Sequence, residues 1–505
     1  MASTNGDASH AEPQQPTQKD DAGNLVVPCL IDGKPVLQPS SSSFPVISSK
    51  EDRVLHYGQN ATVPITHQAI DSAMKTFKSY KHTPVHQRRA MLLKAADLFE
   101  ANAAEAVRRQ MLETSCPLQW AQFNVMLTVS TTREVAAQVV TAVTGEMPPS
   151  YFGSTTLVYR EAVGPVLLIP PWNAALVLSA RSAANALAAG CTLIFKASEL
   201  CPWTHELVVS TFHEAGFPPG AINMLMADRS KGPEITETII AHPSIRKVEF
   251  IGSAAVGRII GATAAKYLKP VFMELGDQSP ALVLEDADLG LAARMCAQGT
   301  LAHQGQVCFS TERIIVMKEV KEEFEKELVE AVEGMVKMGQ AGGVPASVTA
   351  GAAEKAKAGI DAAVKDGAKF LYGSADMTGF ASLSASILTN VDPKSLISTG
   401  ESFAPTAFLL AVDTEEEAIE EANSRIGGLS ASVFTSSYER GIRVARELEF
   451  GGVQINNMTI FAEPTGPTTG FKGSGWGSTH GRYGIQEFLY NKSVSLTPTG
   501  ATGPH

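Results

Sequence analysis

The chain has 505 residues, of which 44% are hydrophobic and 18% charged, and its 52 acidic and 41 basic side chains give a formal charge of −11. A chain of this length is expected to form two to four domains with hydrophobic cores, which excludes disorder as its main state. The acidic balance argues against nucleic-acid binding, because phosphates are bound by clustered Lys and Arg. A charged fraction below the typical ~25% indicates large buried interfaces. We therefore expect an enzyme that acts on small molecules.

The ends of the chain and its cysteines indicate where the protein resides. Residues 1–24 are polar and have neither a basic nor an apolar region, so we expect a disordered arm rather than a secretory signal. We expect no membrane span, because apolar runs of about 18 residues are lacking. The six cysteines form no C-x-x-C pair, which is typical of reduced thiols in a cytoplasmic protein.

Helical and strand patterns alternate along most of the chain. Residues 86–109 place Leu92, Ala95, Ala96 and Phe99 on one face, which predicts an amphipathic helix. Near-continuous apolar runs are typical of parallel strands buried on both faces, and they occur at 163–169, 192–196, 222–225, 248–252 and 281–284. The pattern is interrupted at 275–280 and begins again with a strand at 313–317 and helices over 319–335 and 352–368. We predict an α/β protein with a second unit after this boundary.

A candidate nucleophile lies just before the strand at 313–317. Cys308 is part of HQGQVCFSTERIIV, and a thiol becomes a nucleophile where its surroundings favour the thiolate. Gly305 would permit close approach of the backbone or a ligand. Two alternatives remain open from these residues alone: a buried inert cysteine, and a hydrolase that pairs Cys308 with His303.

Four further motifs follow predicted strands, and the carboxyl ends of strands in open α/β sheets bind ligands. Asn173 in PPWNAALVL would offer an amide donor, while Trp172 is as well explained by packing. Lys196 and Glu199 in KASE suit hydroxyl groups. Gly252, Ser253 and Gly257 form a strand-to-helix turn that leaves N–H groups for a pyrophosphate. Glu274 in MELGDQSP is a candidate base, or simply a surface carboxylate.

The order and spacing of these motifs carry more information than any one of them. PWN, K-x-S-E, F-x-G-S-x-x-x-G, E-L-G-x-x-S-P, G-Q-x-C and E-x-F-x-P (401–405) together resemble the NAD(P)-dependent aldehyde dehydrogenase superfamily, from about residue 25 to residue 495. Within it, PWNAALVLSAR and GQVCFSTERIIV are most similar to the salicylaldehyde, vanillin and benzaldehyde dehydrogenase branch.

The resemblance implies a covalent mechanism. Cys308 takes the place of the nucleophile that attacks the aldehyde carbon, and the amide of Asn173 and the Cys308 N–H would hold the oxyanion. Hydride loss from the thiohemiacetal leaves a thioester, which water activated by Glu274 would hydrolyse. The presence of Glu274 favours a free carboxylic acid as product.

The resemblance also assigns the cofactor and the substrate. A carboxylate at Glu199 favours NAD over NADP, and the implied cofactor residues are Ile169, Pro170, Trp172, Lys196, Ser198, Glu199, Gly252, Ser253, Gly257, Leu275, Glu401 and Phe403. The implied substrate residues are Ala174, Arg181 and Val307. Ala174 and Arg181 stand where the acetaldehyde-oxidising branch has bulky aromatics, which favours a ring-bearing aldehyde. Arg181 would pair with a ring substituent or make an unrelated salt bridge.

Some positions depart from the family pattern. Ala404 replaces a glycine, which would strain the loop of Glu401 if that position needs a positive φ. Asp277 and Gln278 bring a new carboxylate near the base. No relay glutamate is evident in the late loop, and a relay through His480 is only a hypothesis.

The implied architecture comprises a disordered arm (1–24), an NAD-binding domain (25–141 and 164–274), oligomerisation strands (142–163 and 485–500) and a catalytic domain (275–484). Exposed strand edges need a partner, so we expect a homodimer or homotetramer. We expect no metal, nucleic-acid or membrane partner. The alternatives are an aliphatic or semialdehyde dehydrogenase, a nucleotide-independent cysteine hydrolase or thioesterase, and a non-catalytic scaffold.

Overall fold

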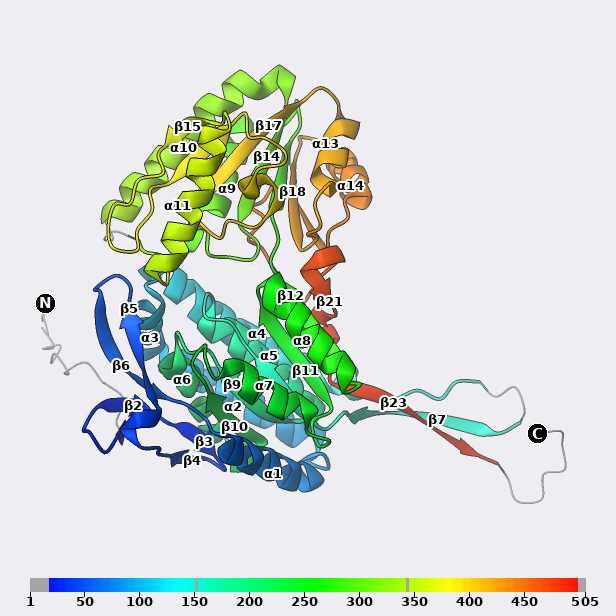
Figure 1. Ribbon diagram of the computed structural model, residues 1–505. Helices are drawn as coiled ribbons and strands as arrows, with labels where there is room; N and C mark the ends of the chain where they lie inside the picture. Colours follow the sequence, from blue (N-terminus) through cyan, green and yellow to red (C-terminus); the bar gives the residue numbers. More distant parts are fainter. Residues whose placement is uncertain (1–17, 150–152, 342–344, 498–505) are drawn as a thin grey trace, which may run out of the picture.

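Two large sheets, each covered by helices on both faces, make up most of the molecule (Figure 1). The computed structural model describes residues 18–149, 153–341 and 345–497. One sheet is built mainly from the first half of the chain and the other from the second half. This arrangement confirms the predicted α/β class with a second unit.

The first sheet contains the predicted buried strands. Its order is β21-β12-β11-β8-β9-β10-β3-β4. The bounds are β3 Cys29–Ile31, β4 Lys34–Val36, β8 Pro165–Ile169, β9 Thr192–Ala197, β10 Ile222–Met226, β11 Lys247–Gly252, β12 Val271–Leu275 and β21 Gly475–Trp476. The five strands from β12 to β10 are mutually parallel and buried, which explains their continuous apolar sequences.

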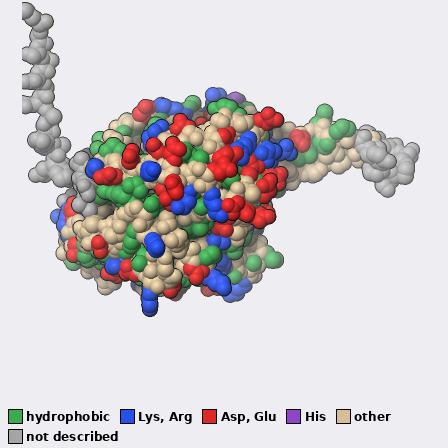
Figure 2. All heavy atoms as spheres, turned by 90° about the horizontal axis from the view of Figure 1, so that it is seen from above, with side chains coloured by type: hydrophobic (Ala, Val, Ile, Leu, Met, Phe, Trp, Pro, Cys, Tyr) green, Lys and Arg blue, Asp and Glu red, His purple; other side chains and the backbone are tan. Residues whose placement is uncertain are grey.

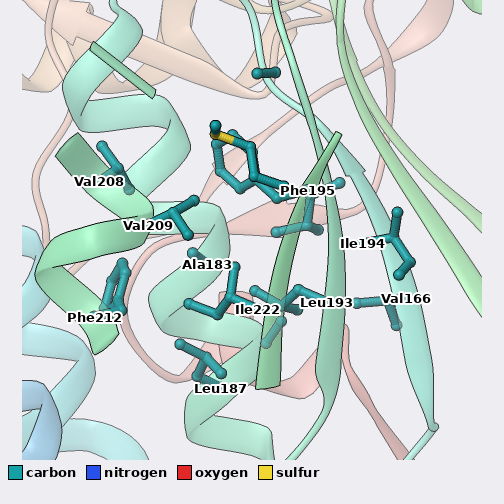
Figure 3. Close-up of a cluster of buried hydrophobic side chains, with 14 of the residues drawn as sticks. Val166, Ala183, Leu187, Leu193, Ile194, Phe195, Val208, Val209, Phe212 and Ile222 are labelled. Carbon is teal, nitrogen blue, oxygen red and sulfur yellow. The ribbon is translucent and has the colours of Figure 1, made fainter. Parts of the chain in front are cut away.

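Helices cover both faces of this sheet. They are α1 Val63–Tyr80, α2 Val85–Ala101, α3 Ala103–Thr114, α4 Leu118–Val143, α5 Ala175–Ala189, α6 Pro202–Glu214, α7 Gly232–Ala241 and α8 Ala254–Lys266. Every residue of α5 is buried, so its polar side chains must find partners inside the protein. Side chains of α5 and α6 pack against the strands, as Figure 3 shows for Ala183, Leu187, Val208, Val209, Phe212, Val166, Leu193, Ile194, Phe195 and Ile222.

The single helix predicted over 86–109 is wrong. The chain forms α2 and α3 instead, and they are separated at Asn102, which has φ −93° and ψ 16°. Both helices contact α4, yet α3 also contacts β5, so the chain must change direction between them. Asn tolerates such non-helical backbone because its side chain competes with the helical hydrogen bonds. The periodic pattern across the break did not reveal this bend.

The second sheet has the order β15-β16-β17-β14-β13-β18-β19. Its strands are β13 Ser279–Val283, β14 Thr311–Met317, β15 Lys369–Gly373, β16 Ser386–Thr389, β17 Thr406–Val412, β18 Ser430–Phe434 and β19 Gly452–Ile455. Its helices are α9 Leu289–Leu301, α10 Lys321–Ala341, α11 Ala350–Lys365, α12 Leu396–Thr399, α13 Glu415–Asn423 and α14 Tyr438–Glu447. The strands predicted at 281–284 and 313–317 are confirmed as β13 and β14.

Three small sheets complete the fold. One has the order β1-β2-β6-β5, with bounds Gln18–Lys19, Leu25–Val27, Arg53–Gln59 and Ser43–Ser48. A second pairs β20 (Thr468–Thr469) with β22 (Ser478–Thr479). The third pairs β7 (Thr155–Ala162) with β23 (Leu489–Leu496) into a ribbon that projects from the body (Figure 1). β7 and β23 lie in the segments predicted as oligomerisation strands, and that role stays a prediction.

Two of the predicted domain bounds can be compared with the observed strands and helices. Residues 1–17 of the expected arm lie outside the described residues, whereas Gln18–Lys19 pairs with β2 in an ordered sheet. β21 and the first four residues of α15 (Gly481–Gln486) fall within the range expected for the catalytic domain, but the two elements attach to β12 and to α4 and α5. The assignment of cofactor and catalytic roles to the two sheets remains a prediction.

Candidate active site

The connection between the two sheets brings together three residues that the sequence singled out. Glu274 lies near the end of β12, and Cys308 lies in the loop before β14. The Cys308 Sγ donates to Glu274 Oε1 at 3.6 Å. Asn173, after β8, is buried and donates from Nδ2 to the carbonyl oxygen of Gln306 at 3.0 Å. A thiol, a carboxylate and an amide donor therefore share one site.

The loop that carries Cys308 has an unusual backbone. His303, Gln304 and Gly305 all have positive φ, at 48°, 59° and 68°. A Cβ at Gly305 would overlap the carbonyl oxygen of Ala404, so the close approach predicted for this glycine is made by backbone. The Gln306 side chain holds the loop by donating to the His303 carbonyl at 3.0 Å and accepting from Val348 N at 2.9 Å. The Gln306 side chain thus ties the loop to itself and to the backbone at Val348.

Gly305→Ala is expected to destabilise the protein by about 2–3 kcal/mol, because the methyl group meets rigid backbone and the φ is unfavourable for alanine. The midpoint of urea denaturation measures this loss. Gly359→Ala on α11 is the matched control, since nothing lies within 4 Å of its added Cβ. A midpoint for Gly305→Ala equal to that of the control would contradict the close contact.

Electrostatics favour a protonated thiol at rest. Burial raises the pKa of Cys308 well above its ordinary value, and the carboxylates of Glu274 and Glu401 raise it further, while Arg181 lowers it. A nucleophilic thiolate therefore requires a nearby proton acceptor. Glu274 Oε1 is in position to accept that proton.

Arg181 lies on α5 and points at the same carboxylate. Its Nη2 donates to Glu274 Oε2 at 2.9 Å, and the two side chains are only 3% and 4% exposed. Arg181 Nη1 also lies 3.5 Å from His480 Nε2. Of the two alternatives for Arg181, the structure shows a salt bridge, but its partner is the candidate base rather than an unrelated group. Nothing in the sequence indicated this pair, because 93 residues separate its members.

The candidate cofactor residues follow the carboxyl ends of neighbouring strands. Ile169 ends β8, Lys196 lies near the end of β9, Gly252 ends β11 and Leu275 ends β12. Pro170 and Trp172 follow Ile169, and Ser198 and Glu199 follow β9. Ser253 caps α8 by accepting from Val256 N at 3.4 Å, and a Cβ at Gly257 would lie 2.7 Å from Leu275. The structure thus gathers these residues along one sheet edge, as expected for a nucleotide site.

Two residues from the second sheet reach the same edge. The Glu401 side chain lies over Gly276, and its Oε1 is buried without a partner among the described residues. A hydroxyl donor such as a ribose would satisfy this oxygen, so the site fits a nicotinamide nucleotide. Phe403 meets Trp172 edge to face at 5.9 Å between ring centroids. Trp172 therefore packs, and it does so beside the candidate nucleotide residues.

The departures from the family pattern have structural explanations. The positive φ falls on Phe403, at 51°, and not on Ala404, so alanine fits its position. Asp277 accepts from the backbone N–H of Leu429 and Ser430, at 2.8 and 3.1 Å, and so joins β18 to the connection between the sheets. Gln278 Nε2 donates to the carbonyls of residues 397 and 400, which steadies the loop before Glu401.

The residues beside Asn173 border an apolar cluster that sequence reasoning missed. Ala174, Val177 and Leu178 pack with Trp120, which donates from Nε1 to the Asn173 carbonyl at 2.9 Å. Trp120 stacks on His303 at 5.5 Å between ring centroids. Trp120 lies on α4, far from every motif, and no signal in the sequence connected it with the site.

A small cavity of about 170 Å³ lies beside β18 and β19, and its lining includes Phe309 and Phe461. Val307, the third candidate substrate residue, is buried next to Cys308.

In the part of the chain that the structure describes, no group of three His, Cys, Asp or Glu side chains is arranged to hold a metal ion. Every helix described is too short or too polar to span a bilayer.

Comparison with known proteins places this site in a family. The sequence profile of the aldehyde dehydrogenase family matches residues 36–494. Vanillin dehydrogenase of Pseudomonas fluorescens is 36% identical over 94% of this chain and 98% of its own. Salicylaldehyde dehydrogenase of Pseudomonas putida is 34% identical over 90% and 95%. The mitochondrial succinate-semialdehyde dehydrogenase of Arabidopsis thaliana is 33% identical over 85% and 82%.

Solved structures agree with the sequence relatives. A salicylaldehyde dehydrogenase from Pseudomonas putida G7, complexed with salicylaldehyde, superposes with a TM-score of 0.89 at 32% identity, over 95% of this chain and 100% of that one. Betaine aldehyde dehydrogenase from Staphylococcus aureus, in complex with NAD+, gives 0.87 at 26% identity, over 94% and 95%. The resemblance drawn from the motifs is confirmed: the chain belongs to the aldehyde dehydrogenase family, whose members are oxidoreductases that act on aldehydes.

Proposed function

We propose that the protein oxidises an aromatic aldehyde to its carboxylic acid with NAD, through a thioester on Cys308. The observation that carries the reaction is the contact between the Cys308 thiol and Glu274 at 3.6 Å, with Asn173 beside them. An aldehyde dehydrogenase that retains this carboxylate can hydrolyse its thioester to a free acid. The relatives named for salicylaldehyde and vanillin support an aromatic substrate.

The first half of the reaction begins with proton transfer. The S–H bond of Cys308 breaks as the proton passes to Glu274 Oε1, and the sulfur then attacks the aldehyde carbon. The carbonyl π electrons move to oxygen, where the Asn173 amide and the Cys308 N–H stabilise the developing charge. Bound NAD supplies a hydride acceptor for the C–H bond. Loss of that hydride re-forms the carbonyl and leaves a thioester on Cys308.

The second half regenerates the thiol. Glu274 first releases the thiol proton to solvent and then takes a proton from water, and the water oxygen attacks the thioester carbon. The C–S bond breaks, the sulfur recovers a proton from Glu274, and the carboxylic acid leaves. The same carboxylate thus serves both half-reactions, which requires it to be ionised at the start of each.

The cofactor is proposed to lie along the carboxyl ends of β8, β9, β11 and β12. Lys196 and Glu199 would hold the adenosine ribose, Ser253 and the start of α8 the pyrophosphate, and Glu401 the nicotinamide ribose. Glu199 is partly exposed and lies 3.9 Å from Arg229, an exposed cation that offsets some of its charge. We nevertheless propose NAD over NADP, because a carboxylate at this position repels a 2′-phosphate.

The proposed substrate class depends on the space beside Asn173. Ala174 carries only a methyl group beside Asn173, and Trp120 provides an aromatic side chain in the same apolar cluster. Flat rings pack well on aromatic side chains. A semialdehyde is the competing substrate, because a succinate-semialdehyde dehydrogenase is also among the relatives.

A substrate panel tests this proposal. We expect kcat/KM for salicylaldehyde to exceed that for acetaldehyde and succinate semialdehyde, with NAD preferred over NADP. Ala174→Phe should lower kcat/KM for salicylaldehyde by about tenfold or more, since overpacking costs about 1–3 kcal/mol, and should affect acetaldehyde much less. A wild-type preference for acetaldehyde or for the semialdehyde would overturn the aromatic assignment.

Oligomeric state and location are also proposals. The ribbon of β7 and β23 projects from the body and exposes Tyr159, Tyr490 and Leu496, which favours pairing with a second copy as a homodimer or homotetramer. All six cysteines are free thiols, which favours a reducing compartment such as the cytoplasm. Acidic and basic side chains are interspersed over the face seen in Figure 2, a distribution unlike a nucleic-acid surface.

A further inference from the structure

One guanidinium in the core lies between two buried carboxylates. Arg181 donates to Glu274 Oε2 at 2.9 Å. The next residue on α5, Ser182, donates to Glu249 Oε1 on β11 at 2.5 Å, and Glu249 interacts electrostatically with both Arg181 and Glu274. Arg181 Nε and Glu249 Oε2 have no hydrogen-bond partner among the described residues. Glu274 therefore lies in a buried environment, in direct contact with the Arg181 guanidinium.

The two oxygens of Glu274 have different partners. Oε2 accepts from Arg181, and Oε1 accepts from the Cys308 thiol at 3.6 Å. A carboxylate with one oxygen held by a rigid planar donor keeps the other oxygen at a fixed angle. Removal of the guanidinium would leave Oε2 of this buried carboxylate without its donor, and the side chain would lose the contact that fixes its orientation. Oε1 would then no longer be held toward the Cys308 thiol.

We propose that Arg181 is a positioning residue for the base: it holds Glu274 Oε2 and thereby aims Oε1 at the Cys308 thiol. This inference rests on the proposed function for the roles of Cys308 and Glu274. In this role Arg181 acts through Glu274, and it does so before any substrate binds.

The surroundings of Arg181 suit this task. A guanidinium only donates, so His480 Nε2 must accept from it, and the His480 proton then lies on Nδ1, which is 2.9 Å from Thr468 Oγ1. Burial, followed by the charge of Arg181, lowers the pKa of His480 well below its ordinary value. The imidazole is therefore neutral, so His480 serves here as an acceptor that orients the guanidinium.

The other titratable groups around the pair are carboxylates and the thiol. Burial raises the pKa of Glu249 to about 7, although Ser182 and the charges of Arg181 and Lys247 oppose the rise. Burial also raises the pKa of Glu401 well above its ordinary value, and this group acts on Cys308 as well. Arg181 is thus the cation that directly contacts Glu274, and it also interacts with Glu249, His480 and Cys308.

The alkylation of Cys308 by iodoacetamide tests the proposal without aldehyde or nucleotide. The other five cysteines are buried, so mass spectrometry can follow the modification at Cys308. We expect Arg181→Met to slow alkylation at neutral pH by about tenfold and to shift the pH midpoint of the rate upward, with partial recovery in Arg181→Lys. Arg133→Met on α4, which loses an exposed ion pair, is the matched control and should match the wild type.

A double-mutant cycle separates action through Glu274 from every other effect. In the Glu274→Gln background, Arg181→Met should change the alkylation rate by less than about threefold. An equal slowing in both backgrounds, or no slowing in either, would overturn the proposal. If Arg181→Met fails to fold, as judged by circular dichroism, Arg181→Lys is compared in the wild-type and Glu274→Gln backgrounds instead. The double variant Arg181→Met/Glu274→Gln removes both charges together.

Steady-state rates distinguish this role from a substrate contact. We expect Arg181→Met to lower kcat to a similar extent with benzaldehyde and with salicylaldehyde. A loss confined to KM for the hydroxylated ring would instead identify Arg181 as a substrate anchor and refute the positioning role. If no aromatic aldehyde is oxidised at all, the proposed function fails, while the alkylation cycle still reports on Arg181.

Discussion

Cys308→Ala is expected to abolish aldehyde oxidation, with a loss on the order of 10⁵–10⁶ in kcat, as for removal of a nucleophile from a covalent catalyst. Without the thiol no thiohemiacetal forms, and the aldehyde hydrate has no route to hydride loss in this site. The measurement is the absorbance of the reduced cofactor during turnover of salicylaldehyde with NAD.

Cys296→Ala is the control for this substitution. Cys296 lies on α9, is buried, and makes no part of the site, so its variant should retain most of the wild-type rate. NAD binding by Cys308→Ala, followed by calorimetry, should remain close to wild type because the nucleotide residues are untouched. Turnover by Cys308→Ala comparable to that of the control would refute the covalent mechanism.

Glu274→Gln is expected to uncouple the two half-reactions. The amide cannot take a proton from water, so steady-state turnover should fall by about 10²–10⁴, the usual contribution of a general base. At high pH the thiol ionises without help, and we expect one equivalent of reduced cofactor per site in a burst, followed by slow thioester hydrolysis. Rapid mixing with NAD and salicylaldehyde measures both phases.

Glu237→Gln controls for the loss of a carboxylate as such. This residue lies on the surface of α7, where it pairs with Lys266, and its replacement should leave both phases unchanged. A Glu274→Gln variant with wild-type steady-state turnover would show that another group activates water. Slow turnover without a burst at any pH would instead place the main role of Glu274 in the first half-reaction.

The buried strands were predicted well because their sequences report burial directly. β8, β9, β10 and β11 lie between neighbouring strands and under helices, so most side chains in them are apolar. The helix pattern over 86–109 was less informative, since the bend at Asn102 arises from how α3 packs and not from the spacing of apolar residues. Local patterns therefore predicted which segments are buried, but not where the chain turns.

In the candidate active site, too, local patterns predicted some residues and missed others. Motifs that follow strands indicated Asn173, Lys196, Glu274 and Cys308, since side chains just beyond parallel strands meet at one edge of a sheet. Trp120 and the pairing of Arg181 with Glu274 could not be predicted in this way. Each depends on how a helix lies against the sheet, and that placement depends on contacts between residues far apart in the chain.

Asp277 and Gln278 show why residue type alone is a poor guide at such a junction. In the sequence, Asp277 and Gln278 place a new carboxylate and an amide close to the candidate base Glu274. In the structure Asp277 turns to the backbone at the start of β18 and Gln278 to carbonyls in and after α12, because buried polar groups must be hydrogen-bonded where the sheets meet.

The sequence by itself determined the α/β class, the buried strands and the family, because the periodicity of apolar residues and the order of short motifs are local properties of the chain. Only the tertiary structure decided which buried charges face one another. α5 had to be laid against the first sheet before Arg181 could reach Glu274, and that contact results from packing of whole elements rather than from any signal near either residue.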